Sequence, residues 1–135
     1  MPFTSTKVGV VQATPQFFDA ERCVERVIAW IEKAAAQGCQ LVLFPESFVP
    51  GYPRGLHFDA VVGRRTERGR DLWLEYWRNS LEAHSPHTAR IGEAARRAGM
   101  FVALGVTERD GGTLYCSIFY FGTNGQFLGS HRKLK

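Results

Sequence analysis

The chain has 135 residues, of which 44% are hydrophobic and 22% are charged, as in an ordinary globular domain. Its length allows a sizeable core, and its 10 Phe, 4 Tyr and 3 Trp argue against disorder. No apolar run approaches the roughly 18 residues that span a bilayer. The first residues lack the basic start and apolar stretch of a secretory signal, so we expect a cytoplasmic protein. Three cysteines, an odd number, do not indicate a disulfide framework.

The formal net charge is +4, but three of these excess positive charges lie in the final segment, 131–135. A second basic segment, 64–70, contains four arginines and is interrupted by Glu67. Nucleic-acid-binding domains carry a basic face or stripe along the body of the fold. The charge pattern therefore does not indicate a nucleic-acid partner. We interpret the arginine segment as a solvated loop or an oligomer contact.

The first part of the chain has the pattern of a parallel βαβ unit. A β-branched run over 7–13 predicts a strand. Asp19 is a favourable N-cap, and apolar residues then recur every three or four positions until Gly38, which predicts an amphipathic helix. Segment 41–44 is apolar at every position, as in a strand covered on both faces. Strand, helix and strand in this order favour parallel pairing.

The second part predicts two more helices and three more strands, and thus an α/β fold with a mixed sheet. The aromatic stripe of Trp73, Tyr76 and Trp77 is typical of a helix whose apolar side faces either the core or an interface. Turn sequences at 110–112 and at Asn124-Gly125 separate the last strands. The expected helices are 72–81 and 88–98, and the expected strands are 101–106, 113–121 and 126–132.

Glu46 is the first candidate for chemistry, because sites in open α/β sheets form at the carboxyl ends of the strands. It follows an all-apolar strand and begins a loop, 45–58, that three prolines stiffen. Partial desolvation there would raise the pKa of the carboxyl group and make it a better base near neutral pH. The alternative is a structural role, in which Glu46 caps a turn or pairs with a surface arginine.

Lys133, after the last expected strand, is the second candidate. An ammonium there would stabilise negative charge in a transition state, although the pattern alone favours a solvated basic end. The cysteines lie in apolar surroundings and are interpreted as packing residues. The histidines are scattered, and neither zinc-ligand spacing nor a phosphate-binding glycine loop occurs, so we expect no metal and no cofactor. The three cysteines are Cys23, Cys39 and Cys116, and the four histidines are His57, His84, His87 and His131.

Four segments together resemble the nitrilases of the carbon–nitrogen hydrolase superfamily. Segment 41–55 (LVLFPESFVPGYPRG) is similar to the catalytic-glutamate segment, and segment 129–135 (GSHRKLK) is similar to the catalytic-lysine segment. Segments 8–13 (VGVVQA) and 113–117 (TLYCS) match the same pattern in the same order. The resemblance covers essentially the whole chain. The Gly-Tyr-Pro-Arg-Gly and His-Arg-Lys-Leu elements favour the nitrilase branch over the amidase branches.

The resemblance implies a partial four-layer αββα sandwich, with residues 1–135 forming the N-terminal part of a single carbon–nitrogen hydrolase domain. It also implies a Glu–Lys–Cys triad, in which Glu46 is the base and Lys133 the cation. Tyr52, in the proline-stiffened loop, is a candidate for substrate contact, and the alternative is that it merely packs there. The family's nucleophilic cysteine lies beyond the lysine segment, and none of the three cysteines occupies its place. We therefore expect this chain alone to be inactive.

The implied function is hydrolysis of a small-molecule nitrile to a carboxylic acid and ammonia. Two alternatives stay open: an amidase-type hydrolase that acts on a linear amide, and an interaction module that keeps the fold without the nucleophile. The resemblance implies a homo-oligomer for the full-length protein. The charge pattern and the lack of a long apolar run lead us to expect no nucleic-acid or membrane partner. Because the chain stops just after the lysine segment, we expect part of a larger domain, with apolar sheet faces and a strand edge left uncovered.

Overall fold

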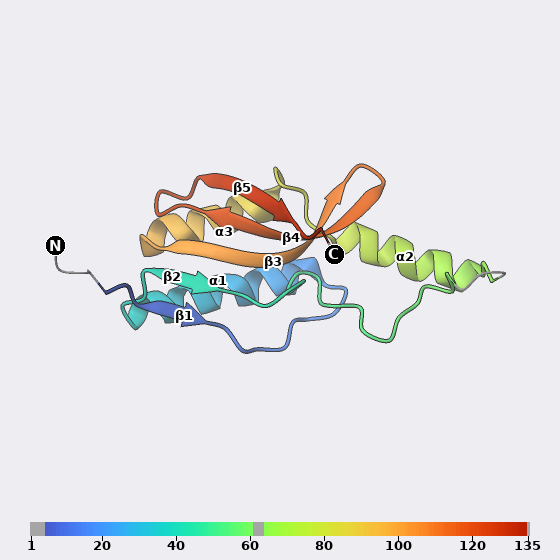
Figure 1. Ribbon diagram of the computed structural model, residues 1–135, viewed down its shortest axis with the longest axis horizontal. Coiled ribbons are helices and arrows are strands. Elements are labelled where there is room, and N and C mark those ends of the chain that lie inside the picture. Colours follow the sequence, from blue (N-terminus) through green and yellow to red (C-terminus); the bar gives the residue numbers. More distant parts are fainter. Residues whose placement is uncertain (1–4, 61–63, 135) are drawn as a thin grey trace.

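The computed structural model describes residues 5–60 and 64–134, which form one mixed sheet with helices packed against it (Figure 1). The helices are α1 (Ala20–Ala36), α2 (Glu67–Asn79) and α3 (Pro86–Ala98). The strands are β1 (Val8–Val10), β2 (Leu41–Leu43), β3 (Phe101–Asp110), β4 (Thr113–Phe121) and β5 (Phe127–Arg132). Their order across the sheet is their order in the sequence.

The strand directions confirm the predicted βαβ unit. β1, β2 and β3 are parallel, whereas β4 and β5 are added as antiparallel hairpin strands. β1 is shorter than the predicted strand over 7–13. β3 is longer than the predicted 101–106, because its pairing with β4 continues until Asp110 lies opposite Thr113.

One face of the sheet is covered by α1 and α3, which lie side by side behind it (Figure 1). The apolar stripe of α1, which includes Val24, Val27 and Ile31, is fully buried there. α3 begins at Pro86, two residues before the predicted start, because Ser85 caps it and proline is tolerated in the first turn. It ends at Gly99, which adopts the left-handed conformation (φ 59°) that favours glycine.

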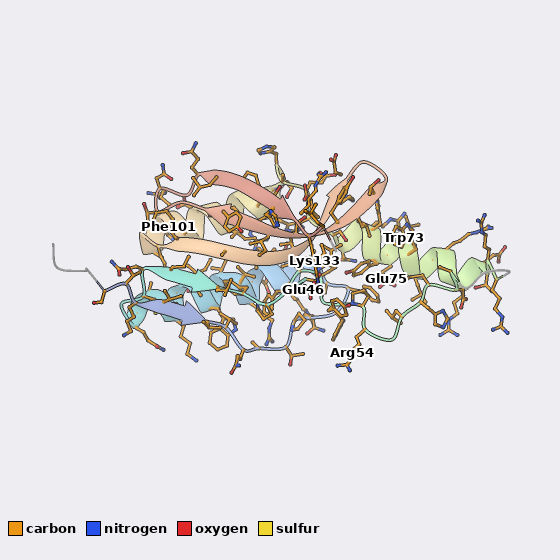
Figure 2. The ribbon with its side chains drawn as sticks, viewed as in Figure 1. Glu46, Arg54, Trp73, Glu75, Phe101 and Lys133 are labelled. Atoms are coloured by element: carbon orange, nitrogen blue, oxygen red, sulfur yellow. The ribbon has the colours of Figure 1, made fainter. Side chains whose placement is uncertain are left out.

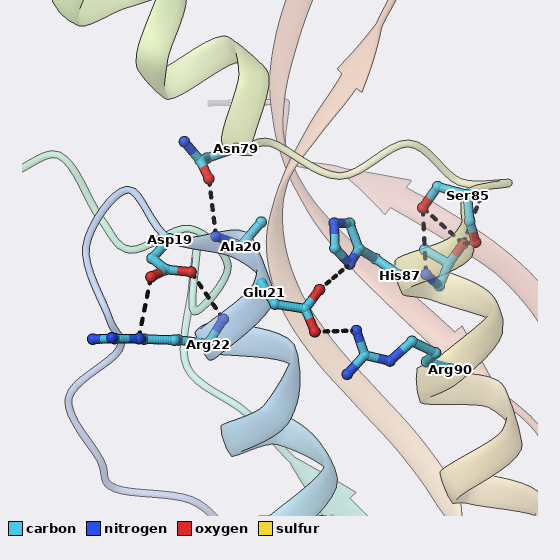
Figure 3. A network of polar contacts seen from close by, with 9 residues as sticks. Asp19, Ala20, Glu21, Arg22, Asn79, Ser85, His87 and Arg90 are labelled. Atoms are coloured by element: carbon cyan, nitrogen blue, oxygen red, sulfur yellow. Dashed lines mark hydrogen bonds and ion pairs between the residues drawn. The ribbon is translucent and has the colours of Figure 1, made fainter.

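Polar contacts tie the start of α1 to the neighbouring helices (Figure 3). The Asp19 side chain accepts a hydrogen bond from the Arg22 amide at 3.0 Å, as the sequence predicted for an N-cap. The Ala20 amide donates to Asn79 Oδ1 at 3.0 Å. Glu21 forms an ion pair with Arg90 of α3. These contacts fix the ends of three helices relative to one another.

α2 extends away from the sheet (Figure 1) and begins at Glu67 rather than at the predicted 72. The reason is the Thr66 side chain, which caps the helix by accepting from the Gly69 amide at 3.1 Å. Of the aromatic stripe, only Tyr76 is buried, and its hydroxyl lies 2.6 Å from Thr107 Oγ1. Trp73 is 42% exposed, so the stripe does not lie wholly in the core.

The second face of the sheet is largely open among the described residues and mostly apolar, although Tyr76 of α2 covers Thr107 on it. Its side chains alternate with the buried ones, as the pleat requires. The structure thus has one helical layer and one sheet layer of the expected αββα sandwich. The large exposed side chains on the strands are Val8, Val10, Leu43, Phe101, Tyr120 and Leu128.

Candidate active site

Glu46 lies in a short outward excursion of the segment that follows β2. Before it, the Phe44 amide donates to the Ala103 carbonyl at 2.9 Å, and after it, the Phe48 amide donates to the Gly105 carbonyl at 2.8 Å. The chain therefore stays attached to β3 on both sides of Glu46. A Cβ at Gly105 would lie 2.0 Å from the Pro45 carbonyl oxygen, so this close approach requires glycine.

Lys133 directly follows β5, and its amide continues the ladder by donating to the Cys116 carbonyl at 2.8 Å. The preceding residue, Arg132, is held on the helix-covered side of the sheet. There its guanidinium donates to both carboxylate oxygens of Glu108, at 2.8 and 3.1 Å, and Ser117 Oγ donates to the same carboxylate at 2.6 Å. Because successive side chains of a strand point to opposite faces, this anchor directs Lys133 to the open face.

The two predicted residues meet on that open face (Figure 2). Lys133 Nζ donates to Glu46 Oε1 at 2.7 Å, although the residues are 87 positions apart in the chain. About half of each side chain is exposed. The Lys133 ammonium holds the pKa of Glu46 below its usual value, and Glu46 in turn raises the pKa of Lys133. The expected rise of the Glu46 pKa by desolvation is therefore wrong, because the lysine contact outweighs burial.

Cys116 is a third member of this cluster, which the sequence did not reveal. Its Sγ donates to Glu46 Oε1 at 3.0 Å, so its interpretation as a packing residue is incomplete. Burial, followed by the hydrogen bond with Glu46, raises the pKa of the thiol. Pairing of Cys116 with Lys133 across β4 and β5 would have indicated that Cys116 lies in the site. That pairing depends on the register of the two strands, which the hydrophobic periodicity alone does not fix.

A cavity of about 470 Å³ opens beside this cluster. His131, which the sequence left without a role, lies on its wall together with Glu46 and Lys133. Across the described residues, no group of three or more His, Cys, Asp or Glu side chains is arranged to hold a metal ion. The other main lining residues are Phe44, Cys116 and Ile118.

The remaining candidates lie elsewhere. Tyr52 is 51% exposed in the loop after Glu46 and is not part of the cavity wall. Cys23 is fully buried in α1, where desolvation raises its pKa to about 11, and its thiol donates to the Gln16 carbonyl at 3.0 Å. Cys39 is half-buried. Within residues 5–60 and 64–134, no helix is long and apolar enough to cross a membrane.

Comparison with known proteins identifies the class to which this fold and site belong. The carbon–nitrogen hydrolase family matches residues 7–135, so the chain belongs to that family. The family assignment and the α/β fold that were expected from the sequence are both confirmed.

The relatives with the higher sequence identity are named as nitrilases. Nitrilase 1 of Arabidopsis thaliana is 39% identical over 133 residues, which are 98% of this chain and 38% of that protein. An aliphatic nitrilase of Sinorhizobium fredii is 41% identical over 131 residues, which are 97% of this chain and 42% of that protein. The chain therefore spans about two-fifths of the length of these relatives.

Solved structures show the same fold at lower identity. An amidase from Nesterenkonia sp. superposes with a TM-score of 0.67 at 20% identity, covering 96% of this chain and 43% of that one. At this identity the likeness concerns the fold alone.

Proposed function

We propose that this chain is the N-terminal part of a nitrilase-type hydrolase, which converts a nitrile to a carboxylic acid and ammonia. The observation that carries the proposal is the contact of 2.7 Å between Lys133 Nζ and Glu46 Oε1 beside a cavity on the open sheet face. In this proposal the nucleophilic cysteine belongs to the C-terminal part of the same domain. That part would also cover the apolar strand face.

The chemistry explains why a carboxylate and an ammonium are needed together. A nitrile carbon is a weak electrophile, and attack by a thiolate gives a covalent thioimidate. Glu46 would accept the thiol proton and later activate water. Lys133 would stabilise the negative charge that develops on nitrogen and in the tetrahedral intermediate. Water adds twice overall, first releasing ammonia and then the acid.

Lys133 and Cys116 lower the pKa of Glu46, which makes it a weaker base than an ordinary glutamate but keeps it charged. The carboxylate is therefore ionised, and able to accept a proton, throughout the neutral range. Tyr52 would border the substrate from the loop after Glu46. Its side chain is half exposed there, outside the cavity wall in the described structure.

The nitrile is favoured over an amide as substrate by the relatives in sequence. Proteins that are 36–41% identical over nearly the whole chain are named as nitrilases or as bifunctional nitrilase/nitrile hydratases. The amidases are similar at about 20% identity, which bears on the fold and not on the substrate. Nitrile and amide preference can be separated by assaying both substrates on the same preparation.

The test is ammonia release from nitriles by the protein that joins this chain to the coding sequence after it. Glu46→Gln should lower kcat/KM by about 10²–10⁴-fold, because the base is lost while the shape is kept. Glu25→Gln, at an exposed position on α1, is the matched control and should have no effect. The 135-residue chain alone should release no ammonia. Near-normal turnover by Glu46→Gln, or turnover by the chain alone, would contradict the proposal.

A further inference from the structure

Cys116 contacts both members of the Glu46–Lys133 pair through different atoms. Its carbonyl accepts from the Lys133 amide at 2.8 Å, which fixes the backbone that carries the ammonium. Its Sγ donates to Glu46 Oε1 at 3.0 Å, which restrains the carboxylate. One residue near the middle of β4 thus contacts two groups that lie 87 positions apart in the chain.

The two donors share a single oxygen of the carboxylate. Lys133 Nζ and Cys116 Sγ both donate to Oε1, at 2.7 and 3.0 Å. Glu46 Oε2 makes no hydrogen bond to any residue in the described part of the chain. A carboxylate that is held through one oxygen keeps the other available as an acceptor. The arrangement therefore distinguishes the two oxygens by their hydrogen bonds.

We propose that Cys116 is a positioning residue for Glu46, and that its thiol acts as a hydrogen-bond donor that leaves Oε2 as the proton-accepting oxygen. The inference rests on the proposed function, because it assigns the role of Cys116 within the same site. It also separates Cys116 from the nucleophile of the reaction.

The thiol is suited to donate rather than to attack. Burial and the adjacent Glu46 carboxylate raise its pKa, so the group carries its proton at neutral pH. A thiol that stays protonated is a poor nucleophile but can donate to a carboxylate. Lys133 and His131 are the other titratable groups that line the cavity with Glu46 and Cys116.

The first test measures the pKa of Glu46 directly, by ¹³C NMR titration of the side-chain carboxyl in the chain. Cys116→Ala should raise this pKa by about half a unit or more, because a hydrogen bond to the charged form is lost. Cys116→Ser should restore it, because the hydroxyl also donates. Cys39→Ser, at the half-buried cysteine before β2, is the control and should leave it unchanged. An unchanged pKa in Cys116→Ala would overturn the proposal.

The second test keeps Cys116 in place, so that it does not depend on the folding of a Cys116 variant. Coupling between two groups is reciprocal, so Glu46→Gln should make the thiol easier to ionise. Alkylation of Cys116 by iodoacetamide at pH 7.5, followed by peptide mass spectrometry, should be about twofold to threefold faster in Glu46→Gln. Equal rates in the two proteins would contradict the coupling. Cys39 serves as the internal reference.

The third test connects the contact to turnover in the complete protein. The acid limb of the pH profile of kcat/KM should move to higher pH in Cys116→Ala and return in Cys116→Ser. A structural role alone would lower activity at every pH without moving the limb, and that result would overturn the proposal. The first two tests need no turnover. If coupling is found but Glu46→Gln remains active, the proposed function fails while the contact stands.

Discussion

At the scale of single residues, the chemistry of Glu46 is decided by the two donors on its Oε1 atom. The Lys133 hydrogen bond is the largest cause of the lowered Glu46 pKa, and the Cys116 hydrogen bond comes second. Both favour the ionised carboxylate, and they outweigh the opposing effect of burial. The carboxylate is therefore ionised at every pH well above this lowered value.

Because the Lys133 hydrogen bond lowers the Glu46 pKa more than the Cys116 hydrogen bond does, the two partners should differ in their effect when substituted. Lys133→Met should raise the Glu46 pKa further than Cys116→Ala does, because the larger contribution is lost. In the complete protein, the acid limb of kcat/KM should lie below the ordinary glutamate pKa of 4.5 and should shift upward in any Lys133→Met protein that retains measurable activity. The ¹³C titration checks the order, and an equal or smaller shift in Lys133→Met would contradict it.

Sequence reasoning identified Glu46 and Lys133 as candidates but not how they interact. The position of Glu46 after an apolar strand indicated partial desolvation and a raised pKa. The opposite direction results from a partner 87 residues away, which no local pattern connects to it. Cys116 was missed for the same reason. It lies in a strand rich in Leu, Ile and Phe, and its Glu46 partner reaches it only through the tertiary fold.

At the scale of the elements, the segment after β2 holds Glu46 in place only because it packs directly on β3. Gly105→Ala should displace this segment, since the added Cβ would lie 2.0 Å from the Pro45 carbonyl oxygen. We expect the free energy of unfolding to fall by about 1–3 kcal/mol. Gly112→Ala is the matched control, because nothing lies within 4 Å of a Cβ there. Urea denaturation measures both, and equal midpoints would contradict this account.

The Glu108–Arg132 contact is the second element-scale feature, since it fixes the end of β5 next to Lys133. Glu108 is 4% exposed, and Arg132 and Ser117 both donate to it. Glu108→Gln should lower the free energy of unfolding at pH 7 by about 2 kcal/mol. Glu93→Gln, which weakens an exposed pair with Arg96 on α3, is the control. It should leave the urea midpoint unchanged.

The pH dependence of the Glu108 contribution has a definite sign. Arg132 lowers the pKa of Glu108 in the folded state. Its stabilising contribution is therefore fully present above the ordinary glutamate pKa of 4.5 and is lost as the pH falls through the lowered folded value. The difference in stability between wild type and Glu108→Gln should shrink in that acidic range. If the stability difference between the two proteins does not change as the pH falls through this range, the charge of Glu108 is not involved.

Most elements were predicted from the sequence because their signals are local. The N-cap at Asp19, the periodicity of α1 and the Asn-Gly turn before β5 are contained in short segments. The errors lie at boundaries, where Thr66 and Ser85 cap α2 and α3 earlier than the apolar pattern begins. The extra length of β3 depends on its partner β4, so it could not be deduced from β3 alone.

At the scale of the whole molecule, the site lies on the face of the sheet opposite to α1 and α3. β4 and β5 bring Cys116 and Lys133 to this face, and the loop after β2 brings Glu46. The same face also carries exposed apolar side chains of β1, β2 and β3, which are Val8, Val10, Leu43 and Phe101. The Glu46–Lys133 pair beside this apolar face fits the proposal that a further part of the same domain completes the site.

The central claim is that Glu46 and Lys133 act as one catalytic pair, and a double-mutant cycle on the complete protein tests it most directly. The measurement is kcat/KM for a nitrile in the wild type, Glu46→Gln, Lys133→Met and the double variant. Each single change should cost about 10²–10⁴-fold, and the double variant should be little worse than either, because groups that act as a unit are not additive. Losses that multiply, or a single variant with near-normal activity, would contradict the account.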